Sequence, residues 1–175
     1  FDEAKQMFIK STQIKPGDVN SYNNLGIALN ALGEFQEAVV CYEKAIKMQP
    51  NYAYAYNNLG NTLKKLLKFQ KAIDYYQKAV EVKPDYTDAH KNLMQILERQ
   101  NQEKELKTAI LNARTSIKDN SVVDLYEGVL LFKKGKFNEA KNCLEQISFD
   151  NVDVEVNLNK ESLRVHTLAK CYDRM

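Results

Sequence analysis

The three prolines of this chain, Pro16, Pro50 and Pro84, are evenly spaced, with a period of about 34 residues. A constant period of this length is typical of a solenoid, in which similar helical units stack one on another. Because each unit contacts only its neighbours, such a fold offers an extended surface. The period therefore directs the search for function to a binding surface rather than to a catalytic cleft.

The residues between the prolines repeat with the same period. Each landmark of one unit recurs one period later, in the pairs Tyr22 and Tyr56, Leu25 and Leu59, Gly26 and Gly60, Leu29 and Leu63, Ala38 and Ala72, Tyr42 and Tyr76, and Ala45 and Ala79. The spacing of Tyr22, Leu25 and Leu29 predicts one face of a first helix, and Ala38, Tyr42 and Ala45 predict a second helix. The small residue Gly26 predicts a close helix crossing, and Gly33 predicts a positive φ between the helices.

This pattern resembles the tetratricopeptide repeat, strongly over residues 19 to 86 and more weakly elsewhere. The resemblance implies an all-α fold, a right-handed superhelical solenoid of antiparallel helix pairs. The expected organisation is a single solenoid over 1–175, with a partial repeat 1–18, repeats 19–52, 53–86, 87–120 and 121–154, an irregular segment 148–160, and a partial repeat 162–175. Repeat 87–120 is degenerate, because Met94 replaces the glycine and Leu106 replaces the alanine.

Composition and motifs exclude several classes of function. The 25 basic and 23 acidic residues give a net charge of +2, which argues against a nucleic-acid partner bound by bulk charge. No apolar run approaches the roughly 18 residues of a membrane span. Cys41, Cys143 and Cys171 are far apart in sequence, so no metal pair is predicted. We expect no enzymatic activity, no cofactor and no metal, and a cytoplasmic location without a membrane partner.

A row of asparagines is the main candidate site. The resemblance implies that the first helices line an inner groove, where Asn24, Asn58 and Asn92 recur at the repeat period. The neighbouring groove positions hold Asn23, Asn57, Asn61 and Lys91. An amide offers both a donor and an acceptor, so a ladder of amides can hold an extended peptide. The repeat region of O-linked N-acetylglucosamine transferase-like proteins looks similar. The alternative is that these asparagines only support helix packing.

The rest of the predicted inner face changes along the chain. The first two complete units add Tyr54 and Lys65, and the third unit is charged, with Lys91 and Arg99. In the fourth unit the same face carries Leu125, Val129 and Phe132, which would form an apolar patch if exposed. One alternative is that segment 148–160 folds back over this face. Another is that this unit is rotated, which Asp124 and Glu127 favour because they occupy places where the repeat has core residues.

The sequence therefore predicts a non-catalytic scaffold that binds a protein or an extended peptide in its concave groove. One alternative is an accessory substrate-recognition region of a larger enzyme, either a glycosyltransferase or a sulfotransferase. Another is self-assembly into a homo-oligomer, because neither end of the repeat array carries a polar cap. A carboxylate clamp of the kind that grips chaperone C-termini is not predicted, since only Asn58 fits its pattern.

Overall fold

The computed structural model describes residues 2–145, 147 and 166–174. The described residues form helices joined by short turns and contain no strand. The predicted irregular segment 148–160, the end of repeat 121–154 and the start of partial repeat 162–175 lie outside the described residues. The all-α fold of helix pairs is confirmed.

Helix positions follow the period of the sequence. After α1 (Asp2–Ile14), the first helices of the pairs are α2 (Val19–Ala31), α4 (Ala53–Lys65), α6 (Thr87–Arg99) and α8 (Ser121–Lys133). The second helices are α3 (Phe35–Met48), α5 (Phe69–Val82), α7 (Glu103–Ser116) and α9 (Phe137–Glu145). A further helical stretch covers 166–173.

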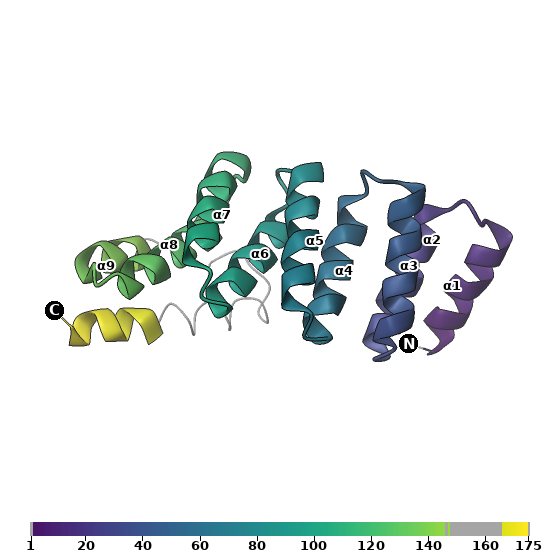
Figure 1. Cartoon of the computed structure of the whole chain (residues 1–175), viewed down its shortest axis with the longest axis horizontal. Helices are drawn as coiled ribbons and strands as arrows, with labels where there is room; N and C mark the ends of the chain where they lie inside the picture. Colours follow the sequence, from purple (N-terminus) through teal and green to yellow (C-terminus); the bar gives the residue numbers. More distant parts are fainter. Residues whose placement is uncertain (1, 146, 148–165, 175) are drawn as a thin grey trace. The chain divides into compact units, whose positions relative to one another are not determined.

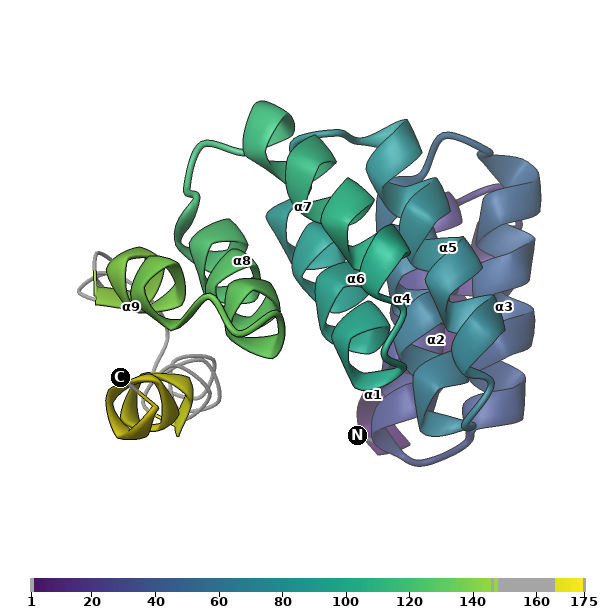
Figure 2. The same cartoon turned by 60° about the vertical axis from the view of Figure 1, so that its left-hand side comes forward.

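The chain divides into two compact units, Phe1–Leu93 and Met94–Met175, and the division falls within α6. In the first unit, each helix from α1 to α4 packs against the next along the chain, and α2 also contacts α4 (Figure 1). The same order can be followed in Figure 2. In the second unit, α7 packs on α8 and α8 on α9.

A close crossing holds the two helices of each regular pair together. A Cβ atom on Gly26 would lie only 2.6 Å from the ring of Tyr42, and one on Gly60 would lie 2.6 Å from the ring of Tyr76. Both rings are almost fully buried. Only glycine leaves room for these rings, because atoms in a packed interior cannot approach so closely. The predicted close crossing at Gly26 is therefore confirmed.

In the degenerate pair α6–α7, two landmark residues are replaced together. Met94 stands where the regular pairs have glycine, and Ile110 stands where they have Tyr42 and Tyr76. Both Met94 and Ile110 are buried. A larger residue on the first helix is thus accompanied by a smaller one on the second, and both changes stay apolar.

The turns within the pairs share one geometry. Gly33, Leu67, Asn101 and Gly135 all have positive φ, with values of 82°, 60°, 53° and 76°. The next residue donates its backbone N–H to the carbonyl five residues earlier, as Lys68 does to Leu63 at 2.9 Å. This bond and the left-handed residue before it define a Schellman end for each first helix. The positive φ predicted at Gly33 is confirmed.

The core between pairs is small and apolar. Tyr22, Ala45 and Ala55 form one buried cluster, which joins α2 and α3 to the first helix of the following pair. Tyr52 packs against this cluster from the turn before α4. Because alanine is so short, the helices can approach closely, and the polar side chains next to the cluster are brought within bonding distance of one another.

Candidate functional site

The predicted asparagine row lies in the first unit, on α2, α4 and α6. Asn24, Asn58 and Asn92 are half-buried, so each amide is partly open to solvent. Asn23 and Asn57, which the sequence placed beside the row, are buried, with exposed fractions of 5% and 4%. The row therefore has an outer line of accessible amides and an inner line of buried ones.

Two outer amides donate to the inner amide of the preceding repeat. Asn58 Nδ2 donates to Asn23 Oδ1 at 3.0 Å, and Asn92 Nδ2 donates to Asn57 Oδ1 at 2.9 Å. Both pairs are separated by 35 residues, one more than the period. The sequence pattern does not reveal these bonds, because the period relates only residues at equivalent positions of the repeats.

The bonds between repeats leave part of each outer amide unused. An asparagine side chain has two N–H donors and one carbonyl oxygen with two lone pairs. In the described part of the chain, Oδ1 of Asn58 and of Asn92 accepts no hydrogen bond, while Nδ2 of each uses one donor. Each amide thus keeps an acceptor and one donor, in an orientation that the bond to the preceding repeat fixes.

The other polar residues predicted on α4 have partners. The phenol of buried Tyr76 donates to Asn61 Oδ1 at 2.8 Å, and burial raises the pKa of this phenol. Lys65 donates to Asn30 Oδ1 at 2.9 Å, and Asn30 donates in turn to Thr62 Oγ1 at 3.0 Å. The contacts of Asn30 also link α4 with α2.

Three tyrosines gather where α4 and α6 begin. The ring of Tyr54 makes edge contacts with Tyr52 and Tyr86, at centroid distances of 5.7 Å and 5.1 Å. Tyr54 is 43% exposed, whereas Tyr52 and Tyr86 are half-buried. The ammonium of Lys83 lies 4.9 Å from the Tyr54 ring centroid and 5.5 Å from that of Tyr86. We call Tyr52, Tyr54 and Tyr86 the tyrosine notch, in which the Lys83 ammonium lies.

Only Tyr54 of the tyrosine notch was predicted from the sequence. The available signal was the pair Tyr52 and Tyr86, which stand one period apart just before α4 and α6. Lys83 had no such signal, because its contact with the rings arises only from the turn that leads into α6. Lys91 is half-buried on α6 in the first unit, and Arg99 is exposed on α6 in the second unit.

The apolar patch predicted on α8 is not exposed. Leu125 and Val129 have exposed fractions of 1% and 4%, so the prediction of an open patch is wrong for both. Leu125 belongs to a buried cluster with Leu144 and Ile147, and Leu168 packs against it. Whether segment 148–160 covers this face stays a prediction, because that segment lies outside the described residues. Phe132 is half-buried and packs against the ring of Phe137, with centroids 5.4 Å apart.

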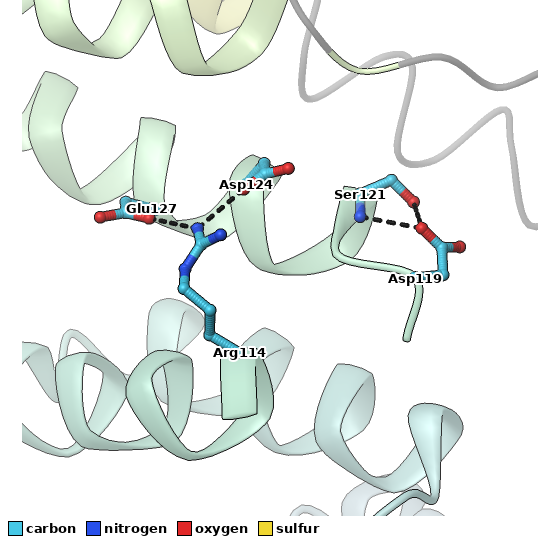
Figure 3. A network of polar contacts seen from close by, with 5 residues as sticks. All are labelled: Arg114, Asp119, Ser121, Asp124 and Glu127. Carbon is cyan, nitrogen blue, oxygen red and sulfur yellow. Dashed lines mark hydrogen bonds and ion pairs between the residues drawn. The ribbon is translucent and has the colours of Figure 1, made fainter. Parts of the chain in front are cut away.

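The two carboxylates at core positions of α8 are paired with an arginine. Arg114 of α7 donates to Asp124 Oδ1 at 2.7 Å and to Glu127 Oε2 at 2.5 Å (Figure 3). Figure 3 shows the guanidinium reaching from α7 to both carboxylates, which lie on successive turns of α8. The hydrogen bonds to Asp124 and Glu127 raise the pKa of Arg114. An ion pair thus replaces the apolar contact that these positions make in the regular repeats.

Two features of the described residues bear on chemistry and location. Nowhere in 2–145, 147 and 166–174 do three or more His, Cys, Asp or Glu side chains come together so that they could hold a metal ion. Among the helices of these same residues, none is long and apolar enough to cross a membrane.

Comparison with known proteins identifies the repeats. A family model described as the tetratricopeptide repeat matches residues 19–85. A search of the curated proteins finds no match by sequence.

Several solved structures have the same fold. YrrB, described as a TPR protein with an unusual peptide-binding site, is 20% identical with a TM-score of 0.71, over 98% of this chain and 94% of YrrB. MamA is 21% identical with a TM-score of 0.73, over 94% of this chain and 91% of MamA. A thermophilic TPR protein of Thermus thermophilus is 16% identical with a TM-score of 0.67, over 96% of this chain and 90% of that protein. At these identities the likeness concerns the fold.

Proposed function

Because residues 19–85 belong to the tetratricopeptide repeat family and the chain has the fold of TPR proteins, we propose that it is a non-catalytic scaffold that binds an extended peptide along α2, α4 and α6. The observation that carries this proposal is the half-used amides of Asn58 and Asn92. Each keeps a donor and an acceptor, as a peptide backbone requires.

The bonds between repeats support binding because they pre-organise the outer amides. A side chain that is free in solution loses rotamer freedom when it binds, and this loss weakens the complex. Asn58 and Asn92 have already lost that freedom to the bonds with Asn23 and Asn57. The packing role and the binding role of the asparagines are therefore compatible, and the first supports the second.

The groove would contact the peptide backbone more than its side chains. Amide pairs recognise N–H and C=O groups of the backbone, so the asparagines alone give little sequence preference. Lys65, Lys91 and the exposed ring of Tyr54 lie on the same helices as the amides and would contact peptide side chains. YrrB, which has the same fold, is described as having an unusual peptide-binding site.

The test is binding of short peptides to single amide variants. An array of random peptides supplies a ligand, whose dissociation constant is then measured by fluorescence anisotropy. We expect Asn58→Ala and Asn92→Ala each to weaken binding by about twofold to twelvefold, the value of one hydrogen bond. Both variants also leave a buried carbonyl on Asn23 or Asn57 without its donor, so each should cost about 1 kcal/mol of folding stability.

A matched variant separates the two effects. Ser21 is buried on α2, and its hydroxyl is hydrogen-bonded to Ser11 at 2.6 Å and also to Asp18, neither of which belongs to the asparagine row. Ser21→Ala should therefore lower stability by a similar amount and leave peptide affinity unchanged. If the asparagine variants weaken binding no more than Ser21→Ala does, the amides serve packing alone and the proposal fails.

A second candidate is a substrate-recognition region of a larger glycosyltransferase or sulfotransferase. The asparagine row favours it, because the row resembles the repeat region of O-linked N-acetylglucosamine transferase-like proteins. The groove would then present a protein substrate to a catalytic domain elsewhere in the same polypeptide. Sequencing the gene on both sides of this segment tests the candidate, which fails if no domain of catalytic size is encoded.

A further inference from the structure

The rings of the tyrosine notch are held in place by their own hydroxyl groups. The Tyr52 hydroxyl donates to Asn20 Oδ1 at 2.9 Å, and the Tyr86 hydroxyl accepts from Asn57 Nδ2 at 3.3 Å. The Tyr54 hydroxyl accepts from Lys83 Nζ at 2.9 Å. Since each phenol is tethered at its oxygen and the rings also contact one another, the notch exists before any ligand arrives.

The notch already holds a cation. The Lys83 ammonium lies near the centroids of two aromatic rings, at 4.9 Å from Tyr54 and 5.5 Å from Tyr86. At such distances the negative ring faces attract a positive charge. The same ammonium makes a hydrogen bond with the Tyr54 hydroxyl. The geometry is therefore that of an aromatic cation site, and a lysine from the end of α5 occupies it.

The charges around the notch also favour a cation. Burial and then the negative charge of Asp88 raise the pKa of Tyr86 to about 12. The pKa of Lys83 is raised by its hydrogen bond to Tyr54 and, more weakly, by the negative charge of Asp85. Two aspartates thus add to the negative potential of the ring faces. A positive group placed there is stabilised both by the rings and by the aspartates.

We propose that the tyrosine notch binds an organic cation, the ammonium or guanidinium group of a Lys or Arg side chain, and that Lys83 fills it in the absence of ligand. The inference rests on the proposed function only in assigning this cation to the bound peptide. The notch stands at the start of α4, one helical turn before Asn57 and Asn58, so a peptide along the asparagine row would bring a side chain to it.

Lys83 acts as an intramolecular competitor for the notch. A tethered group competes at a high effective concentration, so the notch of the natural chain binds free cations weakly. A ligand gains most when it offers a better partner to the rings than an ammonium does. A guanidinium group can stack on an aromatic face and is less strongly hydrated than an ammonium. Arginine peptides should therefore displace Lys83 more readily than lysine peptides.

The experiment removes the competitor and adds a small cation. Tetramethylammonium chloride and N-acetyl-arginine amide are titrated against protein with isotope-labelled tyrosine rings, and potassium chloride at equal ionic strength is the blank. In Lys83→Met we expect the ring signals of Tyr54 and Tyr86 to shift, with an affinity about threefold to thirtyfold higher than in the natural chain. In Lys83→Met combined with Tyr54→Ala the response should disappear, and with Tyr54→Phe it should remain.

A second lysine provides the matched control. Lys44 lies 4.4 Å from the ring centroid of Tyr22, but that ring is only 8% exposed. Lys44→Met removes an equally close ammonium, and we expect no new cation binding. Equal affinity of tetramethylammonium for the natural chain, Lys83→Met, and Lys83→Met combined with Tyr54→Ala would overturn the proposal. Melting curves of every variant verify that each one is folded.

The outcomes also separate this inference from the proposed function. If small cations bind the opened notch while no peptide depends on Asn58 or Asn92, the cation site stands and the peptide groove fails. If peptides depend on these asparagines while Lys83→Met gains no cation affinity, the groove stands and the cation site fails. If the chain has both the peptide groove and the cation site, replacing a single Arg in the bound peptide should weaken binding to Lys83→Met more than to the natural chain.

Discussion

His90 occupies the place that Tyr22 and Tyr56 hold in the two preceding repeats, and its ring is 2% exposed. Nε2 lies 2.7 Å from the carbonyl oxygen of Pro84 and donates to it, while Nδ1 is buried and has no hydrogen-bond partner among the described residues. Burial lowers the pKa of this imidazole, and the bond to Pro84 opposes that shift only in part. The folded protein therefore holds His90 in its neutral form.

This neutral histidine predicts that stability depends on pH. The unfolded chain binds a proton at His90 near the ordinary imidazole pKa of 6.5, whereas the folded chain has a lower pKa there. The contribution of neutral His90 to folding stability is therefore complete above pH 6.5. It is lost as the pH falls through 6.5 toward the lower pKa of the folded state. The slope approaches about 1.4 kcal/mol per pH unit. Urea unfolding at pH 7 and pH 5.5 should show a smaller loss for His90→Phe than for the natural chain.

The control for His90 is the exposed His166. His166→Gln should keep the pH dependence of the natural chain, because this side chain lies outside the core. A loss of stability in His90→Phe that matches the natural chain at both pH values would show that the dependence comes from carboxylates alone.

At the scale of the elements, the four turns with positive φ do not bear the same backbone strain. Gly33 and Gly135 adopt this conformation without strain, and asparagine tolerates it at position 101. Leu67 has φ of 60° and a side chain that is 73% exposed, so it bears the steric cost of a left-handed residue and gains little burial. The turn between α4 and α5 is therefore the strained one of the four.

Leu67→Gly should stabilise the protein. Relief of the left-handed strain contributes about 1–2 kcal/mol, and the greater freedom of glycine in the unfolded chain offsets about 0.5–1 kcal/mol. We expect a net gain of about 0.5–1 kcal/mol in urea unfolding. The reverse exchange at the equivalent turn, Gly33→Leu, should lower stability. A loss of stability in Leu67→Gly would show that its side chain contributes more by contact than the backbone loses by strain.

The α7–α8 contact should be sensitive to salt. Removing Arg114 leaves Asp124 and Glu127 three residues apart on α8, where like charges repel. These side chains are 32% and 39% exposed, so after solvent screening we expect Arg114→Met to cost about 0.5–1 kcal/mol at low salt. Half-molar sodium chloride should reduce that cost. Lys78→Met, which removes an exposed pair with Glu81 inside one helix, should show a smaller effect and is the control.

At the scale of the whole molecule, the period of the sequence and the family resemblance it carries were sufficient to predict the all-α fold of helix pairs. Glycine and alanine landmarks located the close crossings, and the helices begin at Val19, Ala53, Thr87 and Ser121, at the same interval. The sequence could not predict the fit of the α6–α7 pair, because Met94 and Ile110 depart from the landmarks together. Nor could the sequence predict that the boundary between the two compact units falls within α6.

The candidate site was predictable only in part. The asparagine row followed from the period, but its bonds follow from how neighbouring repeats are offset in space, which the period does not encode. The burial of Leu125 depends on Ile147 and Leu168, which lie outside the regular landmarks. The tyrosine notch depends on Lys83, whose contact requires the course of the turn before α6.

The asparagine bonds have a consequence for how this array can change in length. Each bond joins two residues that are one repeat plus one residue apart. A duplicated segment of one full period inserted between α3 and α4 would recreate an outer and an inner asparagine at both new junctions. An insertion that carried only part of a repeat, and so lacked one of the two asparagines, would leave a buried amide without its donor. The paired outer and inner amides therefore permit the array to gain or lose whole repeats by recombination. They disfavour the gain or loss of part of a repeat.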